Sequence, residues 1–306
     1  MACFHGYGKS SSYFEGWYFK HQADGKTLAF IPGFHVDEEG RKSAFIQIIT
    51  EESSWLVHYP ISEFRVSGDR LRIQIGRNLF TSSGIRIDIH TPEVCCRGTI
   101  RYGAFTPLRY DAMGLFRFLP GMECSHGVIS LMHRLHGSLT VNGQHWNVNG
   151  GRGYIEKDWG TSFPKRYFWA QSNDFKERRC SIMVSAAEIP FAGKMFHGCI
   201  GVVWLKGKEY RLATYNGGYP AAWGPRGCIL VRGRYRLDVQ VLEQAGQSLM
   251  APVSGAMSRV IQESAACRVR FRFTENGIVL FDEVSPCASA EYVGKLGKSG
   301  CKAAQK

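Results

Sequence analysis

The stretch LRIQIGRNLFTSSGIRIDIH, residues 71–90, shows the pattern that repeats through most of the chain. Leu71, Ile73 and Ile75 alternate with polar residues, and the same alternation returns over 85–89 after a turn-forming Ser-Gly. A period of two is typical of β-strands that have one apolar and one wet face. This stretch therefore predicts two neighbouring strands.

Similar alternating runs continue to the end of the chain, with Gly, Asn and Asp turn signals between them. Asn142-Gly143 lies between the runs 138–141 and 145–148 and is the strongest short hairpin signal in the sequence. No segment shows a helical stripe over three or more turns. The best helical candidate, 254–266, contains a glycine and closely follows Pro252. The chain is therefore predicted to be predominantly β.

About twenty short strands are more than one open sheet usually holds, because twisted sheets seldom exceed about ten strands without closing or splitting. We therefore expect two barrels or sandwiches, with a boundary in the Gly- and Asn-rich region near 142–152. The irregular connection 107–124 is the kind of long loop that often borders a binding site. The expected division is an N-terminal β domain over 1–146, a C-terminal β domain over 147–294, and a disordered basic tail over 295–306.

The composition is that of a globular protein: 44% of the 306 residues are hydrophobic and 21% are charged. No run approaches the roughly 18 to 20 apolar residues of a membrane-spanning helix. The start of the sequence has neither the apolar core of a secretory signal nor the arginines of a transit peptide. Ten scattered cysteines without a C-x-x-C pair favour free thiols. We expect a cytoplasmic protein.

The formal net charge is +12 with histidine neutral. In runs such as 268–273 the arginines alternate with apolar residues, so most of this charge is expected on the solvated faces of strands. The remaining expectation is peripheral attraction to an anionic membrane surface. No nucleic-acid-binding motif accompanies the charge, so no nucleic-acid partner is expected.

Three segments combine aromatic rings with a carboxylate or an amide, and strand alternation gathers these side chains on one face of each segment. Faces with large rings tend to point into a barrel. One interpretation is structural, in which the polar groups are buried hydrogen-bond partners and the rings are core. The other interpretation is a binding or catalytic site. The three faces are Tyr13, Glu15, Trp17 and Phe19; Tyr154, Glu156 and Asp158; and Trp169, Gln171 and Asn173.

The sequence resembles the tocopherol cyclase family, in particular its shorter bacterial members. The resemblance is carried by YFEGWYFK at 13–20, GRGYIEKDWGTSFP at 151–164 and WAQSN at 169–173, with support from 124–127, 211–216 and 252–264. It implies an all-β fold of two lipocalin-like β-barrels, with a ligand cavity in or between them.

The resemblance also implies an activity. Enzymes of the family take a prenylated benzoquinol, protonate the alkene nearest the ring, and let the phenol oxygen close on the tertiary cation to give a chromanol. This isomerisation needs no redox cofactor. It needs an acid that keeps its proton near pH 7, and an apolar pocket can raise a carboxyl pKa by up to about 3 to 5 units.

On this basis Glu156 is predicted to be the proton donor or the carboxyl that organises it. Glu15 is the alternative acid, and Asp158 is a weaker choice because the family pattern varies at that position. The substrate-binding candidates are Tyr13, Trp17, Tyr154, Trp159, Trp169, Gln171 and Asn173. Alternation places Trp159 on the opposite face from Glu156, which favours a packing role for that ring.

Histidines suggest a competing metal site, since His126, His133 and His136 lie close together in the sequence. On a strand, however, an offset of three places His133 and His136 on opposite faces, unlike an H-x-x-H pair on a helix. We therefore expect no metal and no cofactor.

Two further functions stay open at this point. One is a non-catalytic carrier of an apolar ligand on a lipocalin-like fold, and the other is a hydratase on the same scaffold. An ionisable group with a raised pKa deep in the cavity would separate an enzyme from a carrier. Access of water to the cation would separate a hydratase from a cyclase. The sequence leaves the natural ligand and the oligomeric state open.

Overall fold

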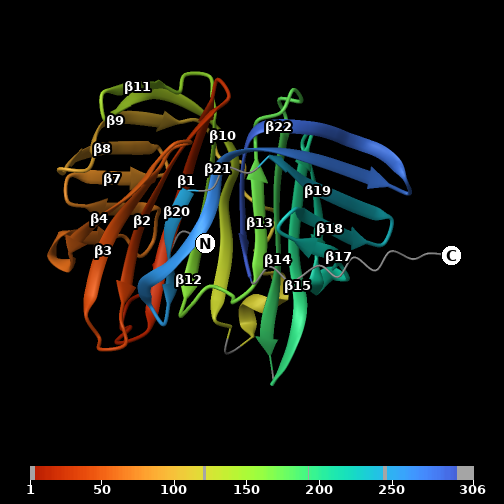
Figure 1. Cartoon of the computed structure of the whole chain (residues 1–306), viewed down its shortest axis with the longest axis horizontal. Helices are drawn as coiled ribbons and strands as arrows, with labels where there is room; N and C mark the ends of the chain where they lie inside the picture. The colour runs from red at the N-terminus through yellow and green to blue at the C-terminus, as the bar shows by residue number, and fades with distance from the viewer. Residues whose placement is uncertain (1–3, 120–121, 192, 244–246, 295–306) are drawn as a thin grey trace.

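The computed structural model describes residues 4–119, 122–191, 193–243 and 247–294, and these fold into two antiparallel β-barrels that lie side by side (Figure 1). The predicted all-β fold with two barrels is confirmed. The first sheet contains β1 (Tyr13–Ala23), β2 (Lys26–Val36), β3 (Lys42–Ile49), β4 (Ser54–Pro60), β5 (Phe64–Val66), β6 (Arg72–Ile75), β7 (Asn78–Thr81), β8 (Gly84–His90), β9 (Cys95–Tyr102), β10 (Cys124–Val141), β11 (Gln144–Asn147) and β12 (Arg152–Gly160). The second contains β13 (Tyr167–Ser172), β14 (Cys180–Phe191), β15 (Lys194–Leu205), β16 (Lys208–Ala213), β17 (Tyr219–Gly224), β18 (Gly227–Arg232), β19 (Tyr235–Glu243), β20 (Gln247–Val253), β21 (Ala256–Glu275) and β22 (Ile278–Val293).

The first sheet runs in the order β4-β3-β2-β1-β12-β10-β9-β8-β7-β6-β5, with β11 paired to β10. Its ends approach each other, because β3 contacts β6 and the Asn78 side chain of β7 donates a hydrogen bond of 3.2 Å to the Tyr59 hydroxyl of β4. The last strand in sequence, β12, thus lies at the centre of this sheet between β1 and β10.

The second sheet runs in the order β16-β15-β14-β13-β22-β21-β19-β18-β17, with β20 paired to β21. It curls in the same way, since β15 contacts β17 and β16 contacts β18. The change from one sheet to the other falls between Gly160 and Tyr167. The proposed domain division at 146/147 stays a prediction, and the predicted tail over 295–306 lies outside the described residues.

Among the described residues, buried apolar side chains form three clusters, one inside each barrel and one between them. The middle cluster includes Tyr18 and Tyr154 from the first sheet and Trp169 and Met183 from the second. Both faces of β1 are consequently covered, one by the first barrel's interior and the other by the second barrel. This double burial explains why aromatic residues occupy both faces of β1 over 13–19.

The predicted hairpin at Asn142-Gly143 is confirmed, with Val141 opposite Gln144 and Ser138 opposite Asn147. Asn142 and Gly143 have φ angles of 47° and 82°, the left-handed conformation that two-residue hairpin turns require. The helical candidate 254–266 is wrong: residues 254–255 form the turn between β20 and β21, and the rest belongs to β21, which pairs with β20 from Ala256 onward.

Three short 3-10 helices complete the described chain: η1 (Ile61–Glu63), η2 (Gly114–Phe118) and η3 (Thr214–Asn216). None of the helices in the described ranges is long and apolar enough to cross a membrane. The irregular connection before β10 contains η2 and, as expected for a long loop, borders the cavity described below.

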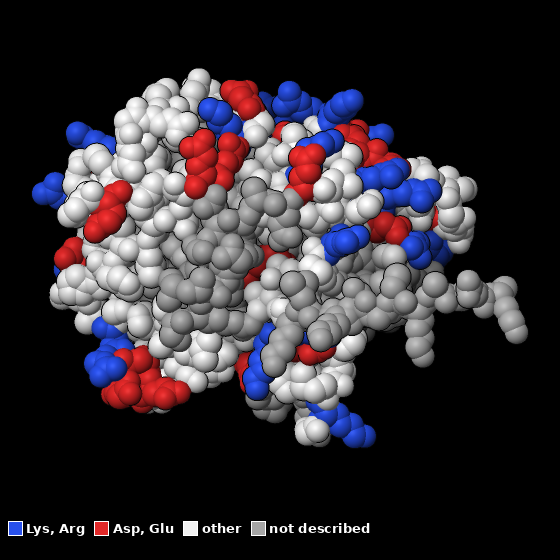
Figure 2. Space-filling model, in the orientation of Figure 1, with Lys and Arg blue, Asp and Glu red and all other residues white. Residues whose placement is uncertain are grey.

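Charged side chains of both signs are interspersed over the face shown in Figure 2. The alternation over 268–273 is also confirmed, since Val269, Phe271 and Phe273 are buried while the arginines between them are exposed. Arg270 pairs with Asp282 of the neighbouring strand at 2.7 Å. Much of the basic excess in this region is thus solvated strand surface.

Candidate active site in the cavity between the barrels

A cavity of about 200 Å³ lies between the two barrels. Its walls come from β1, β2, β3, β10 and β12 on one side and from β13, β14, β15 and β22 on the other. The cavity is also lined by Met113, Phe116, Met122 and Glu123 from the loop before β10, by Phe163 and Pro164 between β12 and β13, and by Pro252 and Met257 from the β20–β21 hairpin. Most lining side chains are apolar, so polar groups among them stand out.

Strand β12 carries the predicted carboxylates into this cavity. Glu156 and Asp158 line it, while the intervening Lys157 is fully buried toward the first barrel's interior. The alternation of successive side chains across a strand produces this arrangement. The predicted common face of Glu156 and Asp158 is therefore present, and it is the face that meets the cavity.

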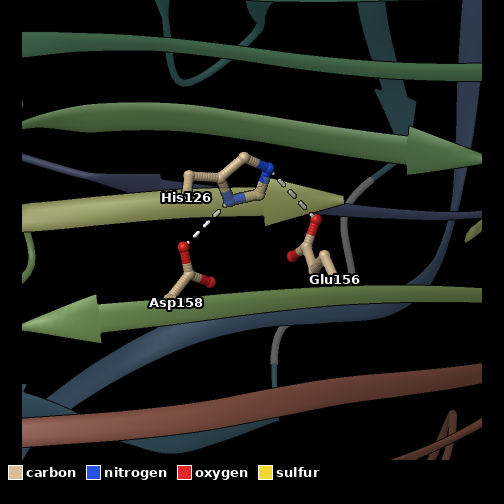
Figure 3. Close-up of side chains that lie close together, drawn as sticks. All are labelled: His126, Glu156 and Asp158. Atoms are coloured by element: carbon tan, nitrogen blue, oxygen red, sulfur yellow. Dashed lines mark hydrogen bonds and ion pairs between the residues drawn. The ribbon is translucent and has the colours of Figure 1, made fainter. Parts of the chain in front are cut away.

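His126 lies directly beside these two carboxylates (Figure 3). It is the cross-strand partner of Asp158 in the β10–β12 pair, and its Nδ1 lies 2.9 Å from Asp158 Oδ1. Its Nε2 lies 3.6 Å from Glu156 Oε2. The Tyr154 hydroxyl donates a hydrogen bond of 2.5 Å to the same Glu156 oxygen. One imidazole thus lies between two acids in the cavity wall.

The charges around His126 change its protonation. Burial alone would lower the pKa of the imidazole, but the carboxylates of Asp158 and Glu156 outweigh it and raise that pKa to about 9. Burial, followed by the charge of Glu156, raises the pKa of the Tyr154 hydroxyl well above 10. At neutral pH the imidazole therefore holds a proton at the cavity wall, and Tyr154 stays a donor to Glu156.

The same three side chains could present ligand atoms to a metal ion. One atom each from His126, Glu156 and Asp158 lies within 4.8 Å of the others. Imidazole with two carboxylates suits several divalent ions. A metal ion and the proton of the imidazolium would compete for His126, so metal binding and proton transfer are alternatives. Activity measured after treatment with a chelator would distinguish them.

Glu15 has a different environment. It is fully buried inside the first barrel, where its Oε1 lies 2.5 Å from the ammonium of Lys157. Tyr13 donates a hydrogen bond to it, and so does the backbone N–H of His5. Burial alone would raise the pKa of this carboxyl, but these hydrogen bonds and the Lys157 charge lower it. Glu15 is thus held as an ionised partner of Lys157, away from the cavity.

The aromatic candidates near Glu15 share its location. Tyr13 and Trp17 belong to the first barrel's core. Trp159 stacks on the His5 ring with 4.5 Å between ring centres, and the Lys157 ammonium lies 4.8 Å from the Trp159 ring centre. The packing role suggested for Trp159 fits this contact. These three rings surround the buried ion pair.

Gln171 and Asn173 contribute to the contact between the barrels. Both are fully buried, and the Gln171 side chain donates to Asn173 at 2.7 Å. Lys20 of the first barrel donates to Gln171, and the Gln22 side chain accepts from the Asn173 backbone N–H. This buried polar network lies outside the cavity lining found for the described residues.

Three of the ten predicted site residues line the cavity: Glu156, Asp158 and Trp169. Tyr154 is fully buried behind the wall, where it contacts Glu156. Sequence reasoning considered His126 only as a metal ligand and did not single out Glu291, which also lines the cavity. The Cys-Ser-His-Gly segment at 124–127 was a signal for His126, but its pairing with β12 is visible only in the structure.

The other two histidines of that region lie elsewhere. His133 is buried and forms a 3.0 Å hydrogen bond with Ser130, and burial lowers its pKa to about 3. His136 is exposed. The expectation that His133 and His136 occupy opposite faces of their strand is thus confirmed.

Fold and site together define an all-β, double-barrel protein with an acid–base cluster in an interbarrel cavity. The family model described as tocopherol cyclase-like matches residues 96–294, and the chain belongs to this family. A crystal structure of a putative AttH from Nitrosomonas europaea has a TM-score of 0.52 and 12% identity over 92% of each chain, which shows a shared fold. Kievitone hydratase from Nectria haematococca matches with a TM-score of 0.49 and 12% identity, over 95% of this chain and 93% of that one.

Proposed function

We propose that this protein catalyses the redox-neutral cyclisation of a prenylated quinol or a similar apolar aromatic, by alkene protonation followed by ring closure of the phenol. The observation that carries the proposal is His126 held between Glu156 and Asp158 in the wall of an apolar cavity. The family membership supports the reaction class.

Each member of the cluster has a distinct part in the proposed proton transfer. His126 carries the proton at neutral pH, and Asp158 fixes the orientation of its ring through Nδ1. Glu156 lies near enough to Nε2 to relay the proton toward an alkene in the cavity. This assignment develops the prediction that Glu156 is either the donor or the carboxyl that organises it.

The rest of the lining suits a short-lived carbocation. Tyr18, Trp169 and several phenylalanines present rings to the cavity, and a ring face beside a desolvated cation contributes about 2 kcal/mol. An apolar lining also limits water, which would trap the cation as an alcohol. The cavity thus favours closure of the phenol onto the cation.

A non-catalytic carrier has no use for the acid–base cluster. Groups with strongly shifted pKa values concentrate at catalytic sites. The raised pKa of His126, at a position that faces the cavity, therefore favours catalysis over simple storage of an apolar ligand.

Access to the cavity is part of the same proposal. Phe116 lines the cavity, while its neighbours Leu115 and Phe118 in η2 are about 70% exposed. Exposed apolar residues with a net charge of +12 suit peripheral contact with an anionic membrane surface, where a prenylated ligand would dissolve. The cytoplasmic location stays a prediction.

The test is to incubate the purified protein with a prenylated hydroquinone under anaerobic conditions and follow the mass and retention of the product. A cyclase gives an isomer of unchanged mass. A product heavier by one water would identify a hydratase instead, and recovery of bound, unchanged quinol would identify a carrier. His126→Gln is the matched inactive control, and dialysis against a chelator is expected to leave the activity intact.

A further inference from the structure

A second polar group lies on the wall that the other barrel contributes to the cavity. Tyr167 and Trp169 are two residues apart on β13, and Glu291 is the cross-strand partner of Trp169 on β22. All three are more than 90% buried and all three line the cavity. The Tyr167 hydroxyl donates a hydrogen bond to Glu291.

Trp169 has an unused hydrogen-bond donor. Its Nε1 is buried and has no acceptor among the described residues. A buried N–H without a partner is costly, and at a binding site a ligand can supply the missing acceptor. Trp146 shares the unpartnered indole but lies in the first barrel's core, so it offers a matched comparison.

Tyr18 connects this wall to the acid cluster. It is the cross-strand neighbour of Glu156 on β1, and its ring meets the Trp169 ring edge-on with 5.7 Å between centres. Its hydroxyl lies 3.2 Å from the Ser289 hydroxyl on β22, two residues before Glu291. The carboxylates Glu156 and Glu291 therefore belong to facing walls of one cavity.

We propose that Glu291, Tyr167 and Trp169 form the subsite for the ring hydroxyl of the substrate, and that Glu291 accepts the phenol proton at ring closure. This inference rests on the proposed function. The phenolic O–H bond breaks, its proton moves to the Glu291 carboxylate, and the oxygen's electron pair forms the C–O bond to the tertiary carbon. The proton delivered from the His126 cluster forms the new C–H bond. Exchange with solvent then restores both groups, and no other reactant is needed.

The chemistry of the subsite selects a phenol or quinol. A hydroxyl can donate to the Glu291 carboxylate and can accept from the Trp169 N–H, whereas an ether can only accept. The two cavity walls would then divide the reaction, with proton delivery on one and proton removal on the other.

The experiment measures binding without turnover. Isothermal titration calorimetry under anaerobic conditions compares an alkyl hydroquinone that has a saturated side chain with its dimethyl ether. Wild-type protein is expected to prefer the hydroquinone by about 10- to 100-fold. Glu291→Gln should reduce this preference about tenfold, because the charged acceptor is lost. Trp169→Phe should weaken hydroquinone binding about 3- to 10-fold, whereas Trp146→Phe should leave it unchanged.

An unchanged preference in a folded Glu291→Gln variant, or equal effects of Trp169→Phe and Trp146→Phe, would overturn the inference. Thermal unfolding of all variants shows whether a loss of binding reflects loss of the fold. The saturated side chain has no alkene to protonate, so this titration tests the subsite separately from turnover of a prenylated hydroquinone. If the protein turns over no prenylated quinol but its preference for the phenol depends on Glu291, the proposed cyclase activity is refuted and the proposed hydroxyl subsite is kept.

Discussion

The two faces of β12 carry two charged clusters in different surroundings, one fully buried and one partly exposed. On one face Lys157 pairs with Glu15 inside the first barrel, where aromatic rings cover both groups. On the other face Glu156 and Asp158 flank His126 at the cavity. Charge in an apolar setting therefore does not by itself make an acid site, because the His126 cluster lines a cavity with space for a ligand whereas the Lys157–Glu15 pair does not.

Glu156→Gln changes only the cavity face of β12. Loss of the relay carboxyl is expected to lower kcat about 10²- to 10⁴-fold, since general acid catalysis contributes this much. The amide can still accept the Tyr154 hydrogen bond, so the free energy of unfolding should change by less than about 1 kcal/mol. Steady-state kinetics and urea unfolding measure the two effects. Full turnover by a folded variant would remove Glu156 from the mechanism.

Lys157→Met, on the other face of β12, is expected to lower the stability of the protein. This change leaves the Glu15 charge buried without its partner and should lower the free energy of unfolding by about 3 to 5 kcal/mol. The double variant Glu15→Gln/Lys157→Met should recover much of the loss, because neither charge then remains buried alone. Urea unfolding of both variants checks this. A single variant as stable as wild type would show that the pair contributes little.

Asp158→Asn tests the electrostatics of the cavity cluster. The raised pKa of His126, about 9 against a usual 6.5, means that its protonated form stabilises the fold below about pH 6.5, and that this contribution is lost as pH rises through about 9. Activity should fall over the same alkaline range. Removing the Asp158 charge should move the fall to lower pH, as measured from the pH profile of kcat. An alkaline limb that does not move would exclude His126 as the proton carrier.

The smallest effect is expected from a glycine at the cavity. A Cβ on Gly16 would meet only the Ile31 side chain, at an ordinary 3.5 Å, whereas a Cβ on Gly153 would lie 2.1 Å from the His133 ring. Gly16→Ala should therefore leave the melting temperature within about 2 °C of wild type, and Gly153→Ala should lower it by several degrees. Differential scanning calorimetry compares them, and equal shifts would contradict the difference in packing.

Periodicity was enough to predict the fold class, because alternation at 71–75, 85–89 and 268–273 records which side of each strand is wet. It also grouped Tyr13, Glu15 and Trp17 correctly on one face. It could not tell which face of β1 meets the cavity, since both faces are buried. The large rings on the Glu15 face suggested that this face binds the ligand, but they form the first barrel's core, and Phe14, Gly16 and Tyr18 on the other face line the cavity.

The site was predictable only where its residues share a strand. Glu156 and Asp158 are two residues apart, so alternation placed them together. His126 joins them through the β10–β12 pairing, and Glu291 reaches the cavity through the β13–β22 pairing. These pairings join residues about 30 and 120 positions apart, and local pattern carries no information about such register.

The alternation of charge along β12 also bears on how the sheet assembles. Sliding this strand by one residue against β1 and β10 would exchange its faces, with the ammonium of Lys157 moved into the cavity and two carboxylates placed among the rings of the first barrel. Each misplaced ion would be buried without its counterion. The charged side chains of β12 thus destabilise a shifted register, which apolar side chains of similar size would not do to the same extent.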